Sequence, residues 1–279
     1  MTATPTPQRL QLSRELRAWR QRRSIEPRQV AARLVCSLSK VSKIENGQAN
    51  ISPLELQILL EMYEVPEGET TERIKAIAEA ARQRSQYRVE PWVRAYINME
   101  TEAVEISYFQ VELIPGLLQT EAYTRVIAAA HGPDRRPVEV ERLVKIRQQR
   151  QARLTDDNPP ALSAVIHESA LRTWVGGADV MHDQLAKLLQ LAALPNVTIQ
   201  VLPFRAGEHR AMGTAFTILR LDTPADSQVV YLEDLWDANY VTRPEQVATY
   251  TEAFDRLVEV SLDETGTVAM IETAMGELR

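Results

Sequence analysis

Residues 30–47, VAARLVCSLSKVSKIENG, decide how the first part of the chain folds. They read as two short helices separated only by residues 35–37, which is the spacing of a helix-turn-helix. Ala31 supplies the small residue that is needed where two helices cross closely. In the second of these helices, Val41 and Ile44 form an apolar stripe, which predicts that this face is buried.

The opposite face of that second helix carries the residues that point to a function. With Val41 and Ile44 buried, Ser39, Lys40 and Lys43 remain outside, so this face is basic and bears hydroxyl groups. Such side chains suit the phosphate oxygens and guanine edges of DNA, although two lysines are also typical of a solvated surface. The helix dipole adds partial positive charge at the start of the helix.

The distribution of charge favours a polyanion-binding module joined to a different body. The chain has 279 residues, 32 Lys+Arg, 38 Asp+Glu and a formal net charge of −6. Its first 50 residues hold 10 basic and 3 acidic side chains, a balance of +7, and the remainder holds 22 against 35, a balance of −13. Because this length fits about two domains, we expect a DNA-binding domain at residues 1–86 and a larger domain at 87–279.

Apolar spacing, N-cap residues and turn residues predict an all-α first domain of five short helices. Ser37 and Ser52 are the expected N-caps of the third and fourth helices, and Asn46-Gly47 supplies a left-handed turn between them. The five helices are predicted at residues 9–23, 27–35, 37–45, 54–63 and 70–86.

The rest of the chain predicts an α+β domain. Residues 100–111 are ambiguous between helix and strand. The two closing helices are expected to begin with capping boxes at Thr242–Glu245 and Ser261–Glu264. We expect a small, mostly antiparallel sheet covered by helices. The apolar runs that predict its strands lie at residues 161–166, 197–202, 215–221 and 229–235.

The stretch VAARLVCSLSKVSKIENG resembles the helix-turn-helix of the phage-repressor type, also called Xre or Cro/repressor-like. Farther along, PGLLQTEAYTRVI, LAALPNVTIQVLPF, AFTILRL and VVYLEDL resemble the C-terminal domain of unknown function in many actinobacterial regulators of this type, including WhiJ-like and antitoxin-like ones. The resemblance covers nearly the whole chain. It implies a sequence-specific transcriptional regulator that binds double-stranded DNA as a homodimer and is modulated by a small partner protein encoded nearby.

The same resemblance implies roles for individual residues of the first domain. An ion pair between the first and third helices is expected from Arg20 and Glu45. The residues expected to contact bases are Leu38, Ser39, Lys40 and Lys43. Those expected to contact phosphates are Arg28, Ser37, Ser42 and Asn46.

Three positions depart from the family pattern. Val35 occupies a turn position often held by glycine, and a β-branched residue is poorly suited to positive φ, so we expect a distorted turn or another conformation. Pro27 replaces the usual glutamine, which removes a side-chain contact to phosphate. Leu38 replaces a polar residue, so it is suited to a thymine methyl group or to no contact.

The larger domain lacks a catalytic or metal-binding signature. No two of its four histidines have metal-ligand spacing, and it has no nucleophile elbow, phosphate-cradling glycine loop or paired carboxylates, so we expect no enzyme activity, cofactor or metal. His167-Glu168 reads as a strand-to-helix corner. Residues 203–213 read as a lid, a docking loop or a plain hairpin loop. Four aromatics suit a pocket, a partner surface or the core, namely Tyr231, Trp236, Tyr240 and Tyr250.

Two function classes other than partner modulation remain open for this body: a metabolite-gated sensor, and an enzyme fused to a DNA-binding head. The single cysteine, Cys36, excludes an internal disulfide and is typical of a reducing compartment. No stretch reads as a signal peptide or a membrane-spanning helix. We therefore expect a cytoplasmic protein that is associated with the nucleoid when it is bound to DNA.

Overall fold

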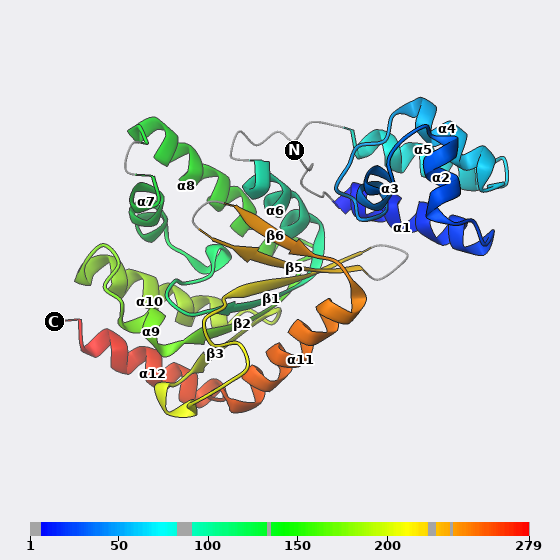
Figure 1. Ribbon diagram of the computed structural model, residues 1–279. Coiled ribbons are helices and arrows are strands. Elements are labelled where there is room, and N and C mark those ends of the chain that lie inside the picture. The colour runs from blue at the N-terminus through cyan, green and yellow to red at the C-terminus, as the bar shows by residue number, and fades with distance from the viewer. Residues whose placement is uncertain (1–6, 83–90, 133–134, 223–226, 235–236, 279) are drawn as a thin grey trace. The chain divides into compact units, whose positions relative to one another are not determined.

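The computed structural model describes residues 7–82, 91–132, 135–222, 227–234 and 237–278. It contains two compact units, one of residues 1–102 with 221–227 and the other of residues 103–220 with 228–279 (Figure 1). The domain boundary predicted at residues 86/87 lies outside the described residues. Among the described residues, no helix has the length and apolar character needed to cross a membrane.

The first unit is helical, and its core draws on every helix from α1 to α5. Leu16, Val30, Val41, Leu59 and Ile74 come from these five helices in turn, and each is almost fully buried in one shared cluster. The helices of this unit are α1 (Pro7–Arg22), α2 (Pro27–Arg33), α3 (Leu38–Glu45), α4 (Pro53–Met62), α5 (Glu69–Ala80) and α6 (Pro91–Glu102).

Two serines begin the helices that matter most for the site. The Ser37 hydroxyl accepts a hydrogen bond from the Lys40 backbone amide at 3.2 Å, so Ser37 is the N-cap of α3. The Ser52 hydroxyl accepts from the Glu55 amide at 3.2 Å, and the Glu55 carboxylate accepts from the Ser52 amide at 2.8 Å. The second pair is a complete capping box. Both N-cap predictions are confirmed.

The first four helices end in the same turn. Ser24, Val35, Gly47 and Glu64 each follow a helix by two residues and have positive φ, at 54°, 50°, 68° and 48°. In each case the next amide donates back to the carbonyl five residues earlier, at 2.8–3.1 Å. This pattern is the Schellman motif. It confirms the turn predicted at Asn46-Gly47, and it repeats at three positions that lack glycine.

Val35 does not distort its turn. The Cys36 amide donates to the Ala31 carbonyl at 2.9 Å and the Val35 amide donates to the Ala32 carbonyl at 3.2 Å, as a regular Schellman motif requires. Val35 is 92% exposed, so no packing interaction compensates for its left-handed backbone. The expectation of a distorted turn is therefore wrong, and the turn keeps its geometry at a conformational cost.

A bidentate ion pair joins α1 to α3. Arg20 donates from Nε and Nη2 to the two carboxylate oxygens of Glu45, at 2.5 and 3.0 Å, and from Nη1 to the Ile25 carbonyl at 2.7 Å. The two side chains are only 10% and 12% exposed. The hydrogen bond that Arg20 donates to the Glu45 carboxylate raises the pKa of Arg20. One guanidinium therefore holds α1, the turn that follows it and the end of α3.

The second unit is built on a six-stranded sheet with the strand order β3-β2-β1-β4-β5-β6. Its strands are β1 (Ala103–Gln110), β2 (Ala161–His167), β3 (Val197–Leu202), β4 (Phe216–Leu221), β5 (Ser227–Glu233) and β6 (Ala238–Val241). Its α-helices are α7 (Glu121–Ala130), α8 (Pro137–Gln151), α9 (Glu168–Arg172), α10 (Ala178–Ala192), α11 (Pro244–Val260) and α12 (Glu264–Gly276).

The sheet is mixed, so the prediction of a mostly antiparallel sheet is wrong. β1 pairs with β2, and β2 with β3, in parallel, whereas β5 and β6 are antiparallel. Parallel neighbours need long crossover connections, and here α7 with α8, then α9 with α10, provide them. The ambiguous segment at 100–111 divides at Glu102, where α6 ends and the central strand β1 begins.

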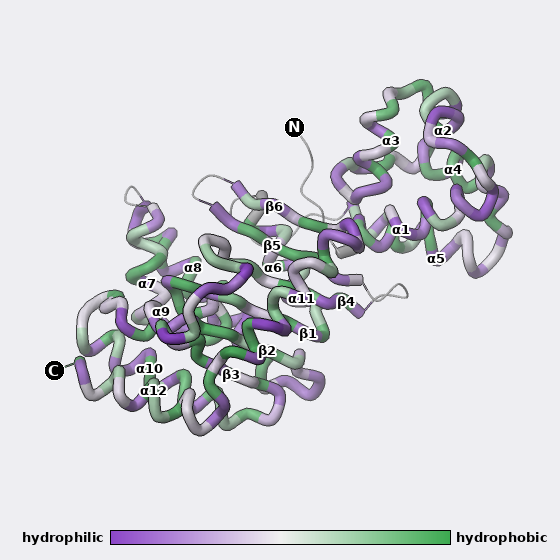
Figure 2. Tube along the Cα trace, turned by 60° about the horizontal axis from the view of Figure 1, so that its bottom comes forward, coloured by the Kyte–Doolittle hydropathy of each residue, from purple (hydrophilic) through white to green (hydrophobic). Residues whose placement is uncertain are grey.

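Both faces of the sheet are covered, and Figure 2 shows apolar residues concentrated along its strands. On one face, Phe109 of β1, Val165 of β2 and Phe254 of α11 share a buried cluster. α10 and α12 lie side by side next to β3 (Figure 1). The two predicted capping boxes are wrong in register. Arg243 precedes α11 without a side-chain cap, and Asp263 caps α12 by accepting from the Gly266 amide at 2.8 Å.

Replacement of Val35 by glycine should stabilise the first unit. We expect a gain of about 0.5–1 kcal/mol, because relief of a left-handed conformation that costs about 1–2 kcal/mol exceeds the extra chain entropy of glycine, about 0.5–1 kcal/mol. Slower hydrogen–deuterium exchange of the α2 and α3 amides would report the gain. Val35→Ala, which keeps a Cβ, should gain less. An equal or lower stability of Val35→Gly would contradict the assignment of strain.

Loss of the Arg20–Glu45 pair should loosen α3. Glu45→Gln leaves a largely buried guanidinium without its carboxylate, which costs about 3 kcal/mol for pairs of this kind. The free energy of opening of the α1 and α3 amides, measured by hydrogen exchange in the full chain, should fall by that amount. Glu72→Gln breaks an exposed ion pair with Lys75 and should cost about 0.5 kcal/mol or less. Similar losses in the two variants would show that the buried pair has no special role.

Candidate nucleic-acid interface

The exposed surface of α3 is a ridge of small polar residues and one lysine. At 3.6 residues per turn, Ser39 and Lys43 lie one above the other, opposite the buried Val41 and Ile44. Ser39 and the neighbouring Ser42 are exposed. Within the described part of the chain, the Lys43 ammonium forms no ion pair. The ridge therefore offers two hydroxyl groups and one available positive charge.

Leu38 and Lys40 lie on the two flanks of this ridge. Leu38, the first residue of α3, is 48% exposed and can meet an apolar group such as a thymine methyl. Lys40 lies on the other flank, where its Nζ forms an ion pair with the Glu55 carboxylate of α4. This hydrogen bond raises the pKa of Lys40. Of the four residues predicted to contact bases, Lys40 is thus the one already bound to another side chain.

Glu55 was not among the residues singled out from the sequence. Burial pushes its pKa upward, but hydrogen bonds from Lys40 and from the Ser52 amide and hydroxyl together hold the pKa below its ordinary value. The contact of Glu55 with Ser52 could be predicted from the sequence, because Ser-Pro-Leu-Glu at 52–55 matches a capping box. The ion pair of Glu55 with Lys40 could not, because it depends on how α3 and α4 pack.

The four residues predicted to contact phosphates differ in how far their side chains are already engaged in hydrogen bonds within the protein. Arg28 is exposed on α2 and forms no ion pair among the described residues. The Ser37 hydroxyl accepts from Lys40 but keeps its proton for donation. Asn46 donates from Nδ2 to the Ser42 carbonyl at 2.8 Å and lies 3.3 Å from the Ser42 hydroxyl. The Arg28 guanidinium is therefore available to bind an anion, whereas the Asn46 side-chain amide is already hydrogen-bonded at the C-terminal end of α3.

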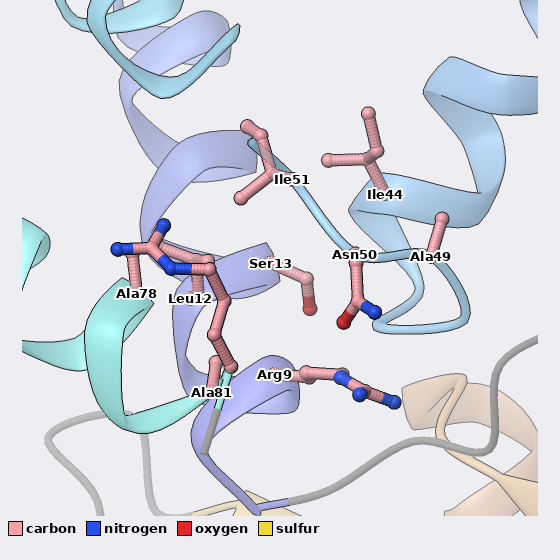
Figure 3. A pocket seen from close by; sticks show the side chains of 10 residues that line it. Arg9, Leu12, Ser13, Ile44, Ala49, Asn50, Ile51, Ala78 and Ala81 are labelled. Carbon is pink, nitrogen blue, oxygen red and sulfur yellow. The ribbon is translucent and has the colours of Figure 1, made fainter. Parts of the chain in front are cut away.

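The first unit also has one small pocket, on the side of α3 that faces α1. Its floor is apolar, with Leu12, Ile44 and Ile51, and Arg9 and Asn50 lie at its edge (Figure 3). It has room for about a single water molecule. The pocket is therefore a packing defect behind α3 and not a ligand site.

In the second unit, the structure brings together two histidines from the segments that the sequence singled out. His167 ends β2 and caps α9; its Nδ1 lies 2.7 Å from the Ser169 hydroxyl, which donates to the Val111 carbonyl at the end of β1. The His209 ring packs edge-on against Phe109, with ring centroids 5.5 Å apart. Burial lowers the pKa of both histidines, and His167 lowers that of His209 further.

The loop at residues 203–213 is not a hairpin. It joins β3 to β4, which are separated in the sheet by β2 and β1, so the loop crosses the carboxyl ends of these two strands. Its backbone is fastened at Phe204, whose amide donates to the Glu168 carboxylate at 2.8 Å. The reading of a plain exposed hairpin loop is therefore wrong.

The aromatics near the last strands belong to the core. Tyr231 and Tyr240 pair across β5 and β6 with ring centroids 5.2 Å apart, and both are buried. Tyr250 packs its ring against Phe216. Trp236 lies outside the described residues. The described part of this group offers packing and no open pocket.

Comparisons with known proteins divide the chain in nearly the same way, except that α6, which belongs to the first compact unit, falls almost entirely within the second match. Residues 11–73 match the family model described as a helix-turn-helix domain, and residues 93–273 match the model described as a domain of unknown function, DUF5753. No curated protein and no solved structure matches the chain. Because the second match covers well over half of the residues, the chain belongs to the DUF5753 family and joins this domain to an N-terminal helix-turn-helix domain.

Proposed function

We propose that the protein is a transcriptional regulator that places α3 in the major groove of double-stranded DNA. The observation that carries the proposal is the ridge of α3, with Ser39, Ser42 and Lys43 outside and the core residues Val41 and Ile44 behind it. Leu38, Ser39 and Lys43 would meet base edges, because hydroxyl, ammonium and methyl-contacting groups are the readers that a major groove accepts.

Phosphate contacts would orient α3 and supply much of the affinity. Arg28 and Ser37 lie at the starts of α2 and α3, where helix N-termini also attract anions. Ser42 and Asn46 would follow along the same helix. Because each neutralised phosphate releases counterions, binding should weaken steeply with salt. The second unit and its acidic balance would stay clear of the DNA.

The family resemblance adds two further parts to the proposal. Two copies of the chain would bind half-sites about one helical turn apart, roughly 34 Å, or a multiple of that distance. The second unit would receive a small partner protein in an antitoxin-like manner. A protein with this role would act in the cytoplasm, at the nucleoid.

A second candidate function is a metabolite-gated regulator, favoured by the position of the His167–His209 corner. Ligands of open α/β sheets bind outside the carboxyl ends of the strands, where successive connections leave the sheet in opposite directions. In the order β3-β2-β1-β4, this point lies beside β1, where the His209 ring packs on Phe109 and the Ser169 hydroxyl donates to the Val111 carbonyl. A ligand there would act only if it bound two states of the protein with different affinity.

The leading proposal predicts that Lys43 contributes to DNA affinity. Genomic duplex fragments retained by the full chain at low salt would first supply the target. Lys43→Ala should weaken binding by about 1–3 kcal/mol if Lys43 reads a base. Lys75→Ala, which removes the same charge from α5, should change the affinity far less. Fluorescence anisotropy measures both, and a wild-type chain that retains no duplex at low salt would overturn the proposal.

The second candidate predicts thermal stabilisation by a small molecule. A panel of amino acids, nucleotides and sugar phosphates would be tested on the full chain. A compound that raises Tm should lose its effect in His209→Ala and keep it in His182→Ala, because His182 is exposed on α10 and lies beside Asp183. If no compound raises Tm, or if both variants respond alike, the corner is not a ligand site.

A further inference from the structure

The first turns of α3 and α4 are held together by one carboxylate. Glu55 accepts from the Ser52 amide at 2.8 Å through Oε2 and pairs with the Lys40 ammonium through Oε1. Both oxygens are thus engaged, one with the start of its own helix and one with the flank of α3. The Glu55 side chain is 19% exposed and the Lys40 side chain is 41% exposed. Glu55 is therefore fixed, while Lys40 stays accessible to solvent.

This arrangement changes what Lys40 offers to a polyanion. A lysine beside a carboxylate at contact distance forms a locally neutral pair, so it adds little to the attraction of phosphates. Lys43, one turn along the same helix, has no such partner within the described residues. The two lysines look equivalent in sequence, but their surroundings differ. The Lys43 ammonium is available to bind DNA, whereas the Lys40 ammonium is paired with a carboxylate.

We infer that Glu55 is a positioning residue that holds Lys40 away from phosphates and so limits the affinity of the first unit for DNA of any sequence, while recognition rests on Leu38, Ser39 and Lys43. This inference rests on the proposed DNA-binding function and removes Lys40 from the base contacts that the family resemblance implies. A free Lys40 would strengthen binding to every duplex alike, because phosphates carry no sequence information. Its capture by Glu55 lowers affinity for DNA in general and leaves the contribution of the base-reading residues in place.

Glu55→Gln removes the negative charge that pairs with Lys40 but keeps the side-chain oxygen that caps the start of α4. Glutamine can still accept from the Ser52 amide, since Gln serves as well as Glu in a capping box, so α4 keeps its start. The amide has no charge to hold Lys40, which becomes available to a phosphate. We therefore expect tighter binding to a duplex of mixed sequence, by several-fold, and a salt-dependence slope steeper by about 0.9, the contribution of one phosphate contact.

Two comparisons assign the effect to Lys40. Glu61→Gln makes the same charge change at an exposed site of α4 and should leave the slope nearly unchanged. In a Lys40→Met background, Glu55→Gln should no longer steepen the slope, because the released ammonium is absent. All variants would be the full chain, measured by fluorescence anisotropy across a series of KCl concentrations on the mixed-sequence duplex and on a genomic fragment selected by the wild type.

The outcomes are distinct. The inference stands if Glu55→Gln alone tightens binding to both duplexes and steepens the slope, and if it needs Lys40 for both changes. It is overturned if Glu55→Gln matches Glu61→Gln, or if the steeper slope persists in the Lys40→Met background. In these cases the wild type still binds DNA and the proposed function survives. A wild type that binds neither duplex overturns the proposed function, and the inference falls with it.

Discussion

The bidentate ion pair between the Arg20 guanidinium and the Glu45 carboxylate is the interaction on which the DNA-binding unit depends. α3 has only eight residues, and a helix of two turns is not stable alone in water. It must therefore be fixed by its surroundings. Val41 and Ile44 bury one face, and the Ser37 cap sets its start. The ion pair sets its end relative to α1, and the Schellman turn at Gly47 stops it. The outward ridge is a consequence of these constraints.

Local features of the first unit could be predicted from the sequence, and features that depend on packing could not. The caps at Ser37 and Ser52 and the turn at Gly47 follow from the side chains at those positions. The turns at Ser24, Val35 and Glu64 have the same geometry without glycine, because backbone hydrogen bonds and the packing of adjacent helices impose it. The Lys40–Glu55 pair joins residues whose proximity no sequence period reveals.

The second unit shows the same division on a larger scale. Four of the six strands are readable as apolar runs, whereas β1 is ambiguous, β6 is missed, and the pairing of the strands is not readable at all. In β2 the three consecutive residues Ala164, Val165 and Ile166 are all buried, so this half of the strand lacks the alternation that marks a half-exposed antiparallel strand. β1 begins where a helix ends, without a break in composition. The His167–His209 corner arises only because parallel strands end at one edge, which requires the strand order. The sequence therefore indicates most of the elements but not the place where they meet.

The strand order also bears on the sequence of events during synthesis. β1 lies at the centre of the sheet, yet its neighbours β2 and β4 come much later in the chain, at residues 161 and 216. Contacts between such distant segments form slowly. Helices α1 to α5, by contrast, all lie within residues 7–80, so even α1 and α5, which pack together from opposite ends of this segment, are both made before β2. Because domains form from the N-terminus as the chain leaves the ribosome, the helical head is complete while the central strand still lacks both partners.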